Sequence, residues 1–206
     1  VSFISKLLPD SIWAVGFVLG SYIVFLLILP LAALFLLIFQ NSWEIILQKA
    51  TDPIAIAAYW LTLKLAFCAA FLNSFFGFII TWVLTRYNFL GKKYLDAAVD
   101  LPFALPTSVA GLTLATIYGE QGWIGSWLKI FNIQVVFTEL GVLLAMIFVS
   151  FPFVIRTLQP VLQELEVSLE EAARSLGASR FQIFVRIILP TLLPAILAGF
   201  TLSFSR

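Results

Sequence analysis

Long apolar runs alternate with short polar segments along this chain of 206 residues. The first run extends from Trp13 to Phe39 without a charged residue, and the others lie at about 55–84, 101–118, 140–162 and 187–205. A transmembrane helix needs about 17–25 largely apolar residues, and every run reaches that length. The pattern predicts an all-α membrane protein, a polytopic helical bundle with five spans in which residues 1–206 form a single transmembrane domain.

The polar segments between the runs differ in charge. Six cations follow the second and fourth runs: Arg86, Lys92, Lys93, Arg174, Arg180 and Arg186. The two intervening segments hold only Lys49 and Lys129. Cationic loops stay on the cytoplasmic side of a membrane. The N-terminus and the segment 163–190 are therefore predicted to face the cytoplasm, or the stroma in a plastid.

Composition supports a lipid environment and excludes several functions. The chain is 62% hydrophobic and 11% charged, whereas soluble domains carry about 25% charged residues. A net charge of +1 offers no field to attract nucleic acid. There is no histidine, and Asp96 and Asp100 are interpreted as charges near a helix N-terminus. We expect no catalytic residue, no metal ligand and no cofactor bound by this chain.

The segment from about 163 to 190 is patterned as two short helices. Ser168 followed by Glu171 fits a capping box, and Gly177 fits the left-handed position that ends a helix. Ser179 followed by Gln182 fits a second capping box. The first helix is expected over 169–176, and its exposed position on the cytoplasmic side makes it a candidate functional element.

A helix of about two turns needs a partner surface, because isolated helices below about 12–15 residues are marginal in water. Ala172 and Ala173 have almost no side-chain bulk and would let another surface approach closely. A helix that only lies on lipid head groups would instead favour bulky apolar residues opposite Lys and Arg. The pattern favours docking into a groove of a partner protein.

The third apolar run begins with two helix-breaking prolines and two hydroxyl residues, namely Pro102, Pro106, Thr107 and Ser108. Non-helical backbone at membrane depth is tolerated where it lines protein or water. We hypothesise that these residues line a pore or gate. The competing interpretation is a proline kink needed only for helix packing. Arg206 is added to the pore set, because a cation inside an apolar run can attract an anion or pair with a carboxylate.

The spacing in the segment 163–190 resembles a known signature. Glu171-Ala172-Ala173, then Gly177, then Ile187, and then Leu189-Pro190 are similar to the EAA loop of the membrane subunits of ATP-binding-cassette importers. The stretches Leu84–Ala115 and Phe151–Glu166 resemble the sulfate/thiosulfate permease subunit of the CysT type, to which the molybdate permease subunit is related.

The resemblance implies a type I importer fold with six spans, of which the sixth is expected after Arg206. It implies a second permease subunit that completes the pore, with a paralogue favoured over a second copy of this chain. Two ATPase subunits would bind ATP and Mg below it, and an external sulfate-binding protein would deliver the anion. Residues 171–173, Gly177, Ile187, Leu189 and Pro190 would make the ATPase contact. The chain would be a transporter subunit and not an enzyme.

Other functions stay open at this point. A molybdate or tungstate importer would use the same subunit design, because these anions share the charge and tetrahedral shape of sulfate. A membrane scaffold without transport and an intramembrane enzyme are more remote. The location is either a bacterial inner membrane or a plastid membrane.

Overall fold

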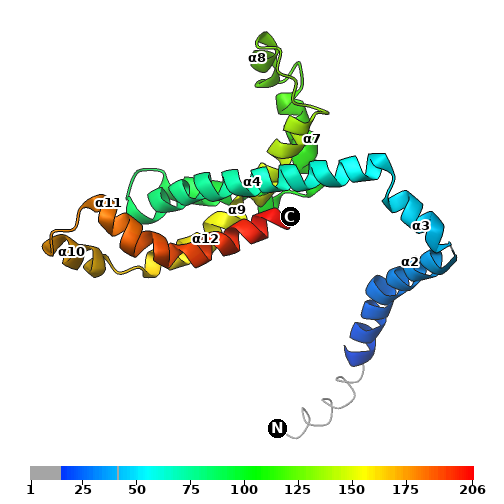
Figure 1. Ribbon diagram of the computed structural model, residues 1–206, viewed down its shortest axis with the longest axis horizontal. Coiled ribbons are helices and arrows are strands. Elements are labelled where there is room, and N and C mark those ends of the chain that lie inside the picture. Colours follow the sequence, from blue (N-terminus) through cyan, green and yellow to red (C-terminus); the bar gives the residue numbers. More distant parts are fainter. Residues whose placement is uncertain (1–14, 41) are drawn as a thin grey trace, which may run out of the picture. The chain divides into compact units, whose positions relative to one another are not determined.

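The computed structural model describes residues 15–40 and 42–206, and every regular element among them is a helix (Figure 1). The all-α prediction is confirmed. Two compact units divide the chain, Val1–Tyr59 and Trp60–Arg206. Four helices of the described part are long and apolar enough to cross a membrane: Val15–Gln40, Pro53–Arg86, Glu139–Glu164 and Arg180–Phe204. The first two residues of the predicted span 13–39 lie outside the described residues.

Two π-helical turns each precede a proline. In the first unit, η1 (Val24–Ile28) leads into α2 (Leu29–Gln40), and α3 (Trp43–Ala50) follows. In the second, η2 (Phe184–Ile188) leads into α12 (Leu189–Phe204). Pro30 and Pro190 lack a backbone N–H and crowd the carbonyl four residues earlier. The wider turn accommodates that crowding, so each helix continues through its proline.

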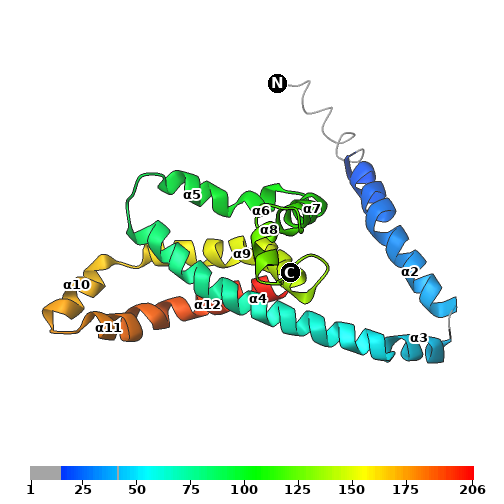
Figure 2. The ribbon, with the colours of Figure 1, turned by 90° about the horizontal axis from the view of Figure 1, so that it is seen from above.

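The second unit is built around α4 (Pro53–Arg86), α9 (Glu139–Glu164) and α12, and the C-terminal part of α4 runs beside the other two (Figures 1 and 2). Val154 of α9 is completely buried between glycines of the other helices. A Cβ atom on Gly77 would lie 2.8 Å from Cγ1 of Val154, and one on Gly199 would lie 3.1 Å from its Cα. Small residues permit this close approach, which drives helix association in lipid.

A buried polar contact joins the same three helices. The amide nitrogen of Asn73 in α4 donates to the hydroxyl oxygens of Ser150 in α9 at 2.8 Å and Ser203 in α12 at 3.1 Å. Asn73 is 1% exposed. Hydrogen bonds of this kind fix which faces of apolar helices meet, because a misplaced amide would be left without partners in the core.

The third predicted span is not one helix. α5 (Lys92–Val99) and α6 (Leu101–Ala104) precede a break at Leu105 and Pro106, after which α7 runs from Thr107 to Tyr118. A helix of 12 residues rises about 18 Å, less than the about 30 Å of the hydrocarbon core. The predicted span at 101–118 therefore stays a prediction. The break lies at the N-terminal end of α7, and α8 (Gly125–Ile130) follows its C-terminal end.

Candidate functional site

The segment between α9 and α12 forms the two predicted short helices, α10 (Val167–Ser175) and α11 (Arg180–Ile183). α10 begins earlier than expected, with Glu166 at its N-cap and no side-chain cap hydrogen bond. Ser168 lies within the first turn, and its hydroxyl donates to the carboxylate of Glu166 at 2.8 Å. The predicted capping box of Ser168 and Glu171 is therefore wrong, because a residue already inside the helix cannot cap it.

The other end of α10 is closed as predicted. Gly177 has φ +86°, the left-handed conformation that glycine adopts without strain. Its N–H donates to the carbonyl of Arg174 at 2.9 Å, and the N–H of Ala178 donates to the carbonyl of Ala173 at 3.0 Å. This pair of bonds is the Schellman arrangement. The capping box of Ser179 and Gln182 then starts α11, which confirms the second prediction.

α10 presents one exposed face. Glu171, Ala172 and Gly177 are exposed, and the side chain of Leu176 is 89% exposed. Glu171 is therefore free to bond a cation, Ala172 offers close approach, and Leu176 offers apolar surface. These four residues, at the C-terminal half of α10 and in the turn that follows, are called the outward face of α10, and a partner protein can reach them.

The inward face of α10 packs on its own subunit. Ala173 contacts a core cluster formed by Leu162, Leu165, Ile183, Ile188 and Leu192. The two alanines of the motif thus have different surroundings: Ala172 is exposed, whereas Ala173 lets α10 approach the body of this chain closely.

A short ion pair fixes the inward face. Nη2 of Arg86, at the end of α4, donates to Oε1 of Glu170 at 2.6 Å. The guanidinium also lies 5.5 Å from the ring centroid of Trp82, within cation–π range. The two partners are 84 residues apart in the sequence, so no local pattern pairs them.

The last predicted contact residues do not share the exposed face of α10. Ile187 lies in η2 and packs on the core cluster, and Leu189 and Pro190 form the start of α12. Leu189 is half-buried and Pro190 is exposed, so only Ile187 is shown packing against the core. A contact between them and a partner protein stays a prediction.

Four of the five predicted pore residues lie in or beside the break between α6 and α7, whereas Arg206 lies at the end of α12. Pro106, Thr107 and Ser108 are exposed at the break, and Pro102 lines an apolar cavity of about 590 Å³ between α4, α5, α7 and α9. The guanidinium of Arg206 lies 5.7 Å from the ring centroid of Phe153.

The rings of Phe153 and Phe103 pack edge to face with centroids 5.0 Å apart. Phe103 belongs to α6, so Arg206 and the proline break are connected through a cation–π contact and an edge-to-face aromatic contact. A role of these residues in the pore stays a prediction.

A charged cluster that the sequence interpretation missed joins α5 and α9. Arg156 donates from Nε and Nη2 to the two carboxylate oxygens of Asp100, at 2.8 and 2.7 Å. It donates from Nη1 to Asp96 at 2.8 Å and also to the side chain of Gln159. Asp96 and Asp100 are thus partners of an arginine and not merely charges near a helix end. Two features of the sequence could have predicted this cluster: the one-turn spacing of Asp96 and Asp100, and Arg156 as the single cation within the fourth apolar run.

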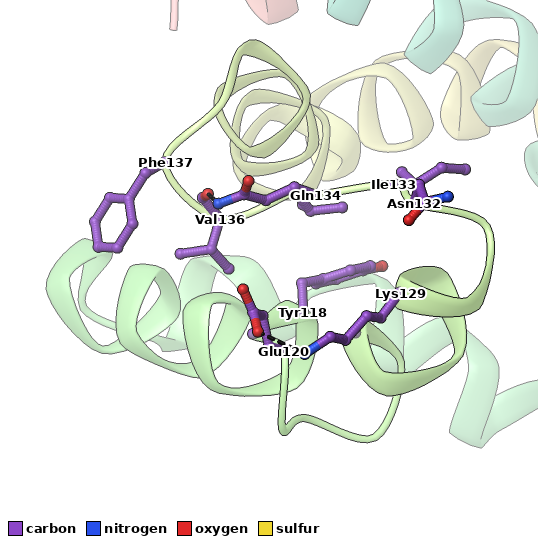
Figure 3. Close-up of a pocket in the computed structure, with 11 residues that line it drawn as sticks. Tyr118, Glu120, Lys129, Asn132, Ile133, Gln134, Val136 and Phe137 are labelled. Carbon is purple, nitrogen blue, oxygen red and sulfur yellow. Dashed lines mark hydrogen bonds and ion pairs between the residues drawn. The ribbon is translucent and has the colours of Figure 1, made fainter.

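The connection between α7 and α9 lines an open pocket of about 420 Å³ (Figure 3). At one edge of the pocket, Nζ of Lys129 donates to Glu120 at 2.8 Å, and this bond lowers the pKa of the Glu120 carboxyl. Phe137 is fully exposed, and Trp123 is 87% exposed. Within the described residues, no group of three or more His, Cys, Asp or Glu side chains is placed to hold a metal ion.

Comparison with known proteins identifies the family. Residues 73–206 match the family described as binding-protein-dependent transport system inner membrane component. The chain is 68% identical over 188 residues to a protein of Prototheca wickerhamii named probable sulfate transport system permease protein cysT. It is 74% identical over 170 residues to the protein of that name from Chlorella vulgaris, and 48% identical over 201 residues to sulfate transport system permease protein CysT of Escherichia coli.

These matches cover 91%, 82% and 98% of this chain, and 74%, 64% and 72% of the three relatives. The chain thus spans roughly two thirds to three quarters of their length. High identity extends over nearly the whole chain, and the family match includes α10, the cluster around Arg156 and the break between α6 and α7. This protein belongs to the binding-protein-dependent transport system inner membrane components, in the group of the CysT permeases.

Proposed function

We propose that this chain forms half of the translocation path of an ATP-binding-cassette importer for sulfate or thiosulfate. The observation that supports this proposal most directly is the outward face of α10. This short helix ends at Gly177 and packs against its own subunit, while Glu171 and Ala172 remain exposed. The substrate is supported by the similarity to relatives named sulfate transport system permeases. As a permease, the chain is a membrane component and not an enzyme.

In this proposal the partner ATPase binds ATP and Mg, and α10 sits in a groove of that ATPase. Glu171 would accept a charge-assisted hydrogen bond from a cation of the groove, and Ala172 would allow the close approach. An external binding protein would deliver the anion, and a paralogous permease would complete the pore. The chain would lie in a bacterial inner membrane or a plastid membrane, with α10 on the cytoplasmic or stromal side, as the cationic loops indicate.

Radiolabelled sulfate uptake in a bacterial strain that lacks its own CysT subunit tests the substrate. Expression of this chain together with its transport partners is expected to restore uptake, and unlabelled thiosulfate should compete while molybdate at equal concentration should not. Competition by molybdate alone would favour the molybdate importer. Co-purification with the ATPase subunit separates a transporter from a membrane scaffold, which would capture no ATPase.

Labelling with a water-soluble thiol reagent tests the pore hypothesis for the break between α6 and α7. The single native thiol is first removed by Cys68→Ser. Thr107→Cys and Ser108→Cys are then expected to react in at least one transport state, and the reaction should block sulfate uptake. Ala110→Cys is the matched control, because Ala110 lies in the same helix but is only 2% exposed. Lack of reaction at both positions in every transport state would leave only the packing role of the prolines.

A further inference from the structure

The Arg86–Glu170 ion pair differs from the other contacts of α10 by its burial. The side chains of Arg86 and Glu170 are 17% and 12% exposed, and their closest atoms are 2.6 Å apart. Arg174 also approaches Glu170, but its side chain is 56% exposed and the separation is 4.0 Å. Exposed pairs contribute little, whereas removing one partner of a buried pair leaves an uncompensated charge. Glu170 is therefore held mainly by Arg86.

Arg86 in turn depends on Glu170 and on an aromatic cluster. Its Nε is buried and has no acceptor among the described residues, so the bond to Glu170 is its main charge-assisted contact. Trp82, over which it lies, packs against Phe78 and Phe184 with centroids 6.0 and 6.3 Å away. The ion pair thus joins the end of α4 to the inward face of α10, and Trp82 beside it contacts Phe184 of η2.

Glu170 and Glu171 are neighbours in sequence but point to different sides of α10. Successive residues of an α-helix are rotated by about 100°, which places Glu171 outward when Glu170 faces inward. The covalent connections of α10 are a short extended link at Leu165 and Glu166 and the turn at Gly177. Neither is a continuous helix, so movement of α10 reaches the membrane helices through side-chain contacts.

We propose that Arg86 and Glu170 are positioning residues that transmit movement of α10 to α4 during the transport cycle. The inference rests on the proposed ATPase contact of the outward face of α10. A displacement of that face by the ATPase moves Glu170, and the short buried bond carries the displacement to the cytoplasmic or stromal end of α4. Without the bond, the ATPase would still bind the outward face but would no longer move α4 efficiently.

The test uses the complete importer in proteoliposomes, with ATPase, second permease and binding protein, and measures radiolabelled sulfate uptake and ATP hydrolysis together. Arg86→Gln and Glu170→Gln are each expected to lower sulfate imported per ATP hydrolysed by about tenfold, equivalent to about 1.4 kcal/mol. Co-purification of the ATPase should persist. The exchanged pair Arg86→Glu with Glu170→Arg should recover a substantial part of the ratio. Arg174→Gln is the matched control and should keep the ratio of the unchanged protein.

Unchanged sulfate per ATP in both single variants would overturn the proposal. If the single variants do not accumulate in the membrane, the variant with both residues exchanged is the deciding measurement. A restored amount of sulfate imported per ATP hydrolysed supports transmission through the ion pair. An amount as low as that of an uncoupled ATPase refutes it. Failure of the ATPase contact itself is distinguishable, because the unchanged protein would then not co-purify with the ATPase.

Discussion

Replacing Arg156 by leucine is expected to destabilise the protein by about 2–4 kcal/mol and to release α5 from α9. Two carboxylates one turn apart, Asp96 and Asp100, would lose their shared guanidinium. Removing one partner of a fully buried ion pair costs about 3–5 kcal/mol, and the effect here should be smaller because the carboxylates are 41% and 47% exposed. Denaturation of the purified protein in detergent measures the loss. Hydrogen exchange should rise in α5 and α6.

Two matched variants identify the cause of that loss. Lys64 pairs with Glu139 at 3.7 Å with both side chains well exposed, so Lys64→Leu should change stability by less than about 0.5 kcal/mol. Adding Asp96→Asn and Asp100→Asn to Arg156→Leu should restore part of the stability, because no unpaired charges then remain. A free energy of unfolding for Arg156→Leu equal to that of the unchanged protein would show that the cluster contributes nothing.

Gly177→Val is expected to abolish most ATPase-coupled sulfate uptake. The glycine has φ +86°, and a left-handed residue with a side chain costs about 1–2 kcal/mol, with the larger values for β-branched residues. A Cβ atom at this position meets nothing within 4 Å, so the effect comes from the backbone alone. The turn would open and displace the outward face of α10. Sulfate uptake and co-purification of the ATPase should both fall about tenfold, corresponding to about 1.4 kcal/mol.

Asparagine provides the control at the same position, because it enters the left-handed region more readily than other residues with a side chain. Gly177→Asn should retain most uptake. If Gly177→Val assembled normally and kept binding-protein-stimulated, coupled uptake, the left-handed turn would have no part in the ATPase contact.

Features determined by neighbouring residues could be predicted from the sequence. The end of α10 at Gly177 and the start of α11 at Ser179 depend on hydrogen bonds within a few residues, and both predictions are confirmed. The break at Pro106 follows from the missing N–H of proline in the same way. The capping box at Ser168 failed although its spacing was right, since α10 extends to Val167 and leaves Glu166 at the cap.

Features that depend on distant residues could not be derived from one sequence. Arg156 finds Asp100 across 56 positions, and Arg86 finds Glu170 across 84 positions. Patterns among neighbouring residues do not show which distant partner each of these charges takes. The inward orientation of Ala173 could not be predicted for the same reason, because it depends on where the core cluster of α9 and α12 lies.

The π turn of η2 contains one residue more than an α-helix would need over the same stretch. Because the π turn accommodates that extra residue, loss of one residue from Phe184–Ile188 would restore the ordinary α-helical repeat and leave the residues that follow close to their present orientation. Leu192, Ala195, Gly199 and Ser203, which form the buried face of α12, would then still face α4 and α9. In an ordinary α-helix the same extra residue would rotate that face by about 100°. The π turn therefore lets the length of this segment differ by one residue without disturbing the packing of α12.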